Sequence, residues 1–285
     1  MFVLTIPNLD LEQIYQSAQD YTIRRVFGFE RSGFLFTCRS CCTKVEQVNG
    51  NRFLFSCTDE DFYNVWFDYF DLSTDYSVLS GLACSATSSN IVRHAARRAT
   101  GVHVLRQDPF EVILRELLFQ GRTLREARDS VNAVKDALSD EKGKAFKGYG
   151  YTRYKLMPSP ERFEHSLDVL QWYVDDETLS RCALLMEWLE THKKLVDPMV
   201  PNGPDEVRRE LKKLGLSRHK ISRVMAYGYG FHDVPCVSPK MESLIEWETG
   251  CEVADVVEYD FPHWEHKAAY IGTILAREQS TKNTW

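Results

Sequence analysis

Three short stretches between residues 33 and 57 constrain the fold of this chain more than any other feature of its sequence. They read SGFLFTC, CTKVEQV and NRFLFSC, and each has the length of a strand and is rich in aromatic, β-branched or alternating apolar residues. The pair Asn49-Gly50 separates the second stretch from the third, and such a pair is typical of a tight turn between antiparallel strands. The sequence therefore predicts an antiparallel sheet in the first third of the chain.

From about residue 75 onward, the apolar pattern changes to helical spacing. The segment DPFEVILRELLFQG begins with Asp108 as an N-cap and Pro109 at the first helical position, and its mostly apolar circumference predicts a buried helix. Further helices are expected over residues 123–138, 161–174, 178–194, 205–214, 219–229, 239–250 and 263–278. Residues 142–163 are expected to form a connection rich in glycine and tyrosine. The chain is thus predicted to be α+β, with a sheet domain over residues 1–100 and a helical region over residues 101–285.

Composition and charge exclude several broad classes of protein. The chain has 285 residues, 44% of them apolar, which is enough for a large core. Its eight cysteines are too sparse for a disulfide scaffold, and no apolar run approaches the length of a membrane span. The formal charge of −6 argues against a protein coated in basic residues, although a local basic patch remains compatible with it. We expect a cytoplasmic protein without a membrane-spanning segment.

A basic run with a glycine inside it distinguishes residues 204–229. PDEVRRELKKL predicts a short helix that Gly215 ends, and SRHKISRVMAYG predicts a second helix directly after it. Seven lysines or arginines and one acid, Glu210, lie between Arg208 and Arg223. The turn amides and the start of the second helix of such a helix-hairpin-helix offer hydrogen-bond donors to a phosphate, and the cations add a salt-dependent attraction. A solvated charged face on two surface helices is the alternative interpretation.

Several segments occur in an order that resembles the helix-hairpin-helix DNA glycosylases, closest to the 8-oxoguanine DNA glycosylase branch. They are LDLEQIYQSAQDY, DEDFYNVWFDYFDLSTDY, GVHVLRQDPFEVIL, LGLSRHKISRVMAYGYG and HWEHKAAYIGTILARE, and together they span nearly the whole chain. The resemblance implies an N-terminal antiparallel domain and an all-helical, two-lobed region whose cleft receives a base flipped out of the duplex. It also implies a monomer that binds double-stranded DNA with a modified base, without a cofactor.

The chain departs from this family at the residues that carry the chemistry. The resemblance places the catalytic aspartate at Val237 and the nucleophilic lysine at His219, with Lys220 one residue later. Valine cannot stabilise the positive charge that develops on the sugar during base excision, so another carboxylate is required. We expect Asp233 or Asp20 in this role. Lys220 is the candidate nucleophile, and its shifted position favours hydrolysis over lyase chemistry.

The resemblance also implies which residues contact DNA. In the hairpin they are Gly215, Ser217, Arg218, His219, Lys220 and Arg223. A wedge that fills the space left by the flipped base is expected after the buried helix, where Gln120 and Arg122 stand in place of asparagines. Ala18 replaces a glycine whose carbonyl reads oxidised guanine in the family. We therefore expect a substrate base other than 8-oxoguanine, such as a bulky or phage-type base.

These inferences predict a DNA N-glycosylase that excises a modified base and leaves an abasic site, in repair or in defence against phage. A catalytically silent relative that binds damaged or modified DNA is the alternative, and Val237 is its main support. We expect no metal site, because neither the pair His263 and His266 nor the thiols of Cys38, Cys41 and Cys57 has a further ligand at matching spacing.

Overall fold

The computed structural model describes residues 2–28, 32–86, 89–140, 142–146, 150–198, 200–260 and 267–282. Its strands are β1 (Phe2–Thr5), β2 (Arg24–Phe27), β3 (Ser32–Cys38), β4 (Cys41–Asn49), β5 (Arg52–Phe55), β6 (Lys142–Phe146) and β7 (Gly150–Tyr154). The helices of the first half are α1 (Leu11–Gln16), α2 (Asp59–Asp61), the π-helix η1 (Phe62–Trp66), α3 (Phe67–Tyr69), α4 (Tyr76–Cys84), α5 (Asn90–Arg98), α6 (Pro109–Phe119) and α7 (Leu124–Leu138). Those of the second half are α8 (Pro160–Glu164), α9 (Leu167–Leu170), α10 (Asp176–Val196), α11 (Pro204–Lys213), α12 (Arg218–Tyr227), α13 (Pro239–Thr249), α14 (Val253–Asp260) and α15 (Lys267–Lys282).

The N-terminal sheet is antiparallel and has the strand order β1-β5-β4-β3-β2. The predicted turn at Asn49-Gly50 is confirmed, since Asn49 pairs with Arg52 and Gly50 adopts a positive φ of 46°. Strands β1 and β2 lie at the two edges of the sheet and were not predicted. A core of aromatic side chains, including Phe36 and Trp66, fills the space between the sheet and the η1–α3 segment.

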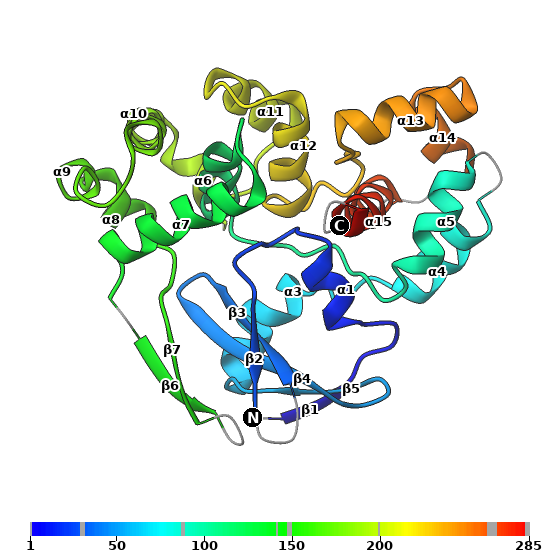
Figure 1. The fold of residues 1–285 in the computed structure, drawn as a ribbon, viewed down its shortest axis with the longest axis horizontal. Helices are drawn as coiled ribbons and strands as arrows, with labels where there is room; N and C mark the ends of the chain where they lie inside the picture. Colours follow the sequence, from blue (N-terminus) through cyan, green and yellow to red (C-terminus); the bar gives the residue numbers. More distant parts are fainter. Residues whose placement is uncertain are drawn as a thin grey trace.

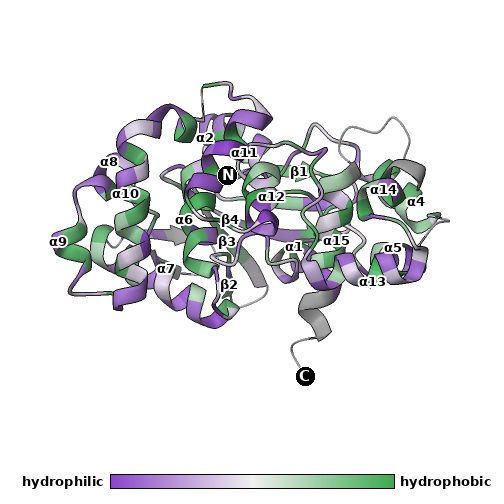
Figure 2. Ribbon diagram, turned by 90° about the horizontal axis from the view of Figure 1, so that it is seen from above, coloured by the Kyte–Doolittle hydropathy of each residue, from purple (hydrophilic) through white to green (hydrophobic). Residues whose placement is uncertain are grey.

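The helices from α5 onward form a layer that lies above the sheet in Figure 1. Helix α6 is at the centre of this layer and packs against α7, α10 and α12. Seen from above in Figure 2, α6 is largely hydrophobic, as its sequence predicted. None of the helices in the described parts of the chain is long and apolar enough to cross a bilayer.

The predicted sheet domain, residues 1–100, contributes two helices to the core of the helical region, which the sequence did not indicate. Helices α4 and α5 pack against α15, and their apolar side chains join the helical core and not the core under the sheet. The boundary near residue 100 between a sheet domain and a helical region stays a prediction.

Two other expectations required correction. Residues 142–163 contain an antiparallel pair of strands, β6 and β7, where a connection was expected. The helix expected over residues 161–174 is broken into α8 and α9. The expected helix over residues 263–278 corresponds to α15, and residues 261–266 lie outside the described part of the chain.

Candidate functional site

The predicted helix-hairpin-helix is formed by α11, a short turn and α12. Gly215 ends α11 with a φ of +77°, a conformation that favours glycine. Gly215, Ser217 and Arg218 are exposed, as are the lysines Lys212 and Lys213 at the end of α11. Ser217 is the N-cap of α12 but its side chain makes no capping bond, so the first amides of this helix remain open to an acceptor. The outer surface of the hairpin therefore suits an anion.

The side chain of Gln120 fastens this turn to the end of α6. Its amide nitrogen donates to the Gly215 carbonyl at 2.9 Å, and its amide oxygen accepts from the Ser217 backbone at 3.0 Å. Gln120 was predicted to contact DNA next to a wedge. The structure places its amide on the hairpin turn, where it fixes the positions of the Gly215 carbonyl and the Ser217 N–H.

Beneath the turn, α6 and α12 share a buried group of ions that we call the Glu116 cluster: Glu116, Lys220 and Arg223. The Glu116 carboxylate contacts the Lys220 ammonium at 2.8 Å and Nε of Arg223 at 2.7 Å. All three residues are buried. Burial opposes ionisation of Glu116, but the two cations outweigh it and lower the pKa of Glu116 to about 2. Glu116 is therefore an anion at neutral pH.

The two cations of the Glu116 cluster make further contacts that fix their positions. The Lys220 ammonium lies 3.4 Å from the centre of the Phe119 ring. Nη2 of Arg223 donates to the Ala18 carbonyl at 2.9 Å, and Ala18 adopts a positive φ of 54°. The carbonyl that the resemblance assigns to base reading is thus already bonded to an arginine.

His219 and Val237 lie next to each other, so the hairpin and the loop after it converge here. The His219 imidazole interacts with the backbone of Val237, whose side chain is buried. Burial, together with the positive charge of Arg223, lowers the pKa of His219 to about 4. His219 is therefore neutral at physiological pH and adds no charge to the hairpin.

The two carboxylates predicted from the sequence lie in different surroundings. Asp20 is buried, ion-paired with Arg115 and hydrogen-bonded by Tyr69 and Thr22. Burial raises the pKa of Asp20, but the Arg115 charge and the Thr22 bonds act against it and the net shift is downward. Asp233 is exposed in the loop before Val237.

Arg122 is held by acidic and hydroxyl groups of neighbouring helices. Its guanidinium contacts the carboxylates of Asp175 at 2.8 Å and Glu177 at 3.0 Å, and it donates to Thr178 at 2.7 Å. Only 8% of its side chain is exposed. Insertion of Arg122 into DNA would require these bonds to break.

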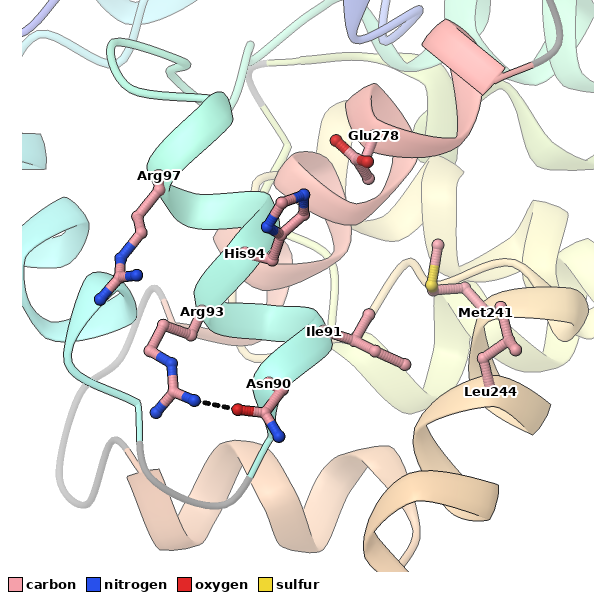
Figure 3. A pocket seen from close by; sticks show the side chains of 8 residues that line it. All are labelled: Asn90, Ile91, Arg93, His94, Arg97, Met241, Leu244 and Glu278. Atoms are coloured by element: carbon pink, nitrogen blue, oxygen red, sulfur yellow. Dashed lines mark hydrogen bonds between the residues drawn. The ribbon is translucent and has the colours of Figure 1, made fainter.

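A separate pocket lies between α5, α13 and α15, as Figure 3 shows. Ile91, Met241 and Leu244 line one part of it, and none of the residues predicted for the site lines it. Within the described ranges, no group of three or more His, Cys, Asp or Glu residues could hold a metal ion. His263 and His266 fall outside those ranges.

Glu116 was not among the site residues predicted from the sequence. A usable signal was present, because the adjacent charges of Arg115 and Glu116 interrupt a helix predicted to be buried. Ionisable side chains in such a helix need partners. The sequence does not say which residues supply them.

Comparisons with known proteins agree with this architecture. Residues 2–113 match the family model of the 8-oxoguanine DNA glycosylase N-terminal domain. The Clostridium acetobutylicum 8-oxoguanine glycosylase/lyase, solved in its apo form, has a TM-score of 0.77 at 15% identity and covers 96% of this chain and 95% of its own. The same enzyme solved with DNA containing 8-oxoguanine opposite cytosine gives a TM-score of 0.77 at 15% identity over 99% of both chains. The Archaeoglobus fulgidus 3-methyladenine DNA glycosylase has a TM-score of 0.70 at 11% identity and covers 98% of this chain and 99% of its own. A search of curated protein sequences found no significant match.

Proposed function

We propose that this chain is a helix-hairpin-helix DNA glycosylase that binds double-stranded DNA and excises a modified base, leaving an abasic site; the match of residues 2–113 to the 8-oxoguanine DNA glycosylase N-terminal model and the fold shared with solved glycosylases support this. One observation carries the proposal. The exposed hairpin turn with Gly215, Ser217 and Arg218 leads into α12, and α12 carries Lys220 and Arg223, the two cations that pair with Glu116 of α6. Helix α12 thereby connects the surface that we assign to phosphate binding with the buried ionic cluster that it shares with α6.

The outer surface of the hairpin supports DNA binding. Gly215 gives the turn its shape, the open amides at the start of α12 can donate to a phosphate, and Arg218 supplies a charge beside them. Lys212 and Lys213 add cations on the preceding helix. Contacts of this kind give an affinity that falls as the salt concentration rises.

The Glu116 cluster supports a catalytic role for a carboxylate that the family resemblance does not supply. Excision builds positive charge on the deoxyribose, and a fixed anion near the sugar lowers the energy of that state. We assign this part to Glu116, because it is ionised at neutral pH and its charge acts on His219, the neighbour of Val237. Asp20 is paired with Arg115 of α6 and not with a residue of the hairpin, and Asp233 is exposed to solvent.

The contact between Arg223 and Ala18 argues for a base other than 8-oxoguanine. In the family resemblance, the carbonyl at position 18 accepts from the oxidised base. Here the Arg223 guanidinium already donates to that oxygen, and a donor on the base would have to displace a buried charge-assisted bond. A base that presents acceptors to Arg223 fits this arrangement better.

The proposal is tested with duplexes that each carry one candidate modified base. After incubation with the protein, heating in alkali breaks the strand wherever an abasic site has formed. We expect breaks with at least one modified base, and a loss of about 10²–10³-fold in rate for Glu116→Gln. The exposed α11 residue Glu206 provides the matched control, and Glu206→Gln should leave the rate unchanged.

Two outcomes would contradict this assignment. If Glu116→Gln retains excision while Asp20→Asn or Asp233→Asn loses it, the carboxylate role belongs to that aspartate. If the protein binds a broad panel of modified duplexes, including glucosylated phage DNA, without any strand break, it is a silent DNA-binding relative. The buried Val237 in place of a carboxylate is the observation that favours this second function.

A further inference from the structure

A second cationic site lies where β2, α7 and β7 meet, and we call it the basic pocket. Its lining includes the six cations Arg24, Arg25, Arg128, Lys135, Arg153 and Lys155. One carboxylate, that of Asp136, lines it with them. None of these residues belongs to the hairpin or to the Glu116 cluster, so the proposed glycosylase site does not account for the pocket. Figure 1 shows β6 and β7 beside the five-stranded sheet, with α7 above them.

Internal bonds hold several of the cations along the wall, some through neutral carbonyls and some through carboxylates. Arg24 donates to the Arg153 carbonyl at 3.0 Å, and Arg128 donates to the Tyr21 carbonyl at 3.1 Å. A backbone carbonyl satisfies a donor but carries no net charge. Lys155 pairs with Asp136 at 2.8 Å. Arg25 pairs with Glu12, a neighbour outside the lining. The wall is therefore ordered, and although Arg25 and Lys155 are paired with carboxylates, Arg24 and Arg128 keep their positive charge.

Lys135 is the residue that points most directly to a ligand. It is 7% exposed and lines the pocket from α7. Among the described residues its ammonium has no hydrogen-bond or ion-pair partner; the carboxylates of Glu111 and Asp20 act on it only through longer-range attraction. Burial lowers the pKa of Lys135, because it disfavours the charged ammonium, and the attraction of Glu111 and Asp20 offsets this only in part. A bound anion would supply the partner that the protein does not.

The pocket is large enough for more than a single small ion. Its volume of about 560 Å³ lies in the range typical of small-molecule sites. A monovalent anion would leave several of the lining cations uncompensated, whereas two or more closely spaced phosphates would match them better. We propose that the basic pocket binds a ligand carrying at least two phosphate groups, with Lys135 at its buried end and Arg128 and Arg153 at its exposed rim.

Two sources can supply this chemistry: a free nucleotide-sized polyphosphate, or successive phosphates of a nucleic-acid strand. The probes are inorganic triphosphate and a single-stranded oligonucleotide, each titrated into the full chain by calorimetry at several salt concentrations. We expect binding of at least one probe that weakens as salt increases. Affinity for triphosphate alone identifies a free ligand, and affinity for the oligonucleotide alone identifies a strand.

Lys135→Met is the decisive variant. It should lower the affinity about tenfold or more, equivalent to ~1.4 kcal/mol. The melting temperature should stay the same or rise, because the change removes an unpartnered buried charge. A lysine with a purely structural role would instead lower the melting temperature and leave the affinity unchanged, which would overturn the proposal.

A second pair of changes keeps the test independent of folding. Arg128 and Arg153 are exposed, so the double variant Arg128→Ala with Arg153→Ala should fold and lose affinity. Arg52→Glu, at an exposed arginine outside the pocket, is the charge control and should bind like the wild type. If neither probe binds, or if the double variant binds as the wild type does, the pocket is not a phosphate site. Arg218→Glu in the hairpin should leave triphosphate binding intact, which separates this proposal from the glycosylase function.

Discussion

The single residue Glu116 pairs with two buried cations, so its substitution should lower the free energy of unfolding. Glu116→Gln leaves Lys220 and Arg223 without their anion, and loss of one partner from a buried pair typically costs about 3–5 kcal/mol. Because the folded-state pKa of Glu116 is lowered to about 2, its stabilisation is complete above its ordinary pKa of 4.5 and is lost as the pH falls toward 2. Urea unfolding at pH 7 and at pH 3 should therefore show a smaller gap between wild type and variant at the lower pH. A gap that stays constant would contradict this account, and Glu206→Gln is the control.

At the scale of elements, two hydrogen bonds from the Gln120 side chain fix the turn between α11 and α12. Gln120→Ala should cost about 0.5–1.5 kcal/mol for each hydrogen bond lost. It should also weaken duplex binding several-fold, because the Gly215 and Ser217 backbone groups are no longer held in place. Fluorescence anisotropy with a labelled duplex measures this change. Gln171→Ala, which removes only a local bond to the Asp168 carbonyl, should leave the affinity unchanged. Equal affinities for wild type and Gln120→Ala would show that the two Gln120 hydrogen bonds are not needed for duplex binding.

The last helix supports the loop after the hairpin, and this contact belongs to the scale of the whole molecule. A Cβ at Gly272 on α15 would lie 2.7 Å from the Cys236 sulfur and 2.9 Å from its backbone nitrogen. Gly272→Ala should therefore push α15 away from the loop and cost about 1–3 kcal/mol. Gly81 on α4 has open space around it, so Gly81→Ala should stabilise by about 0.5–1 kcal/mol. Thermal unfolding of the two variants checks the prediction, which fails if both melting temperatures move in the same direction.

Local signals were sufficient for several elements of the fold but not for all of them. Alternating strand residues and Asn49-Gly50 predicted the β4–β5 hairpin, and Asp108 with Pro109 predicted the start of α6. The basic run around Gly215 predicted the α11–α12 hairpin. The pairing of β6 with β7 was missed, because their lysine-, glycine- and tyrosine-rich segments carry no apolar alternation.

Capping, turn chemistry and apolar spacing act within a few residues, so the sequence alone predicted most of the helices and strands β3, β4 and β5, but not β1, β2, β6 or β7. Only the tertiary structure decided how the charges pair. It placed Glu116 between Lys220 and Arg223, turned Arg122 toward Asp175, and left Lys135 in a pocket without a partner. Such pairings join residues far apart in the chain, and their energies depend on burial and distance, which a linear sequence does not contain.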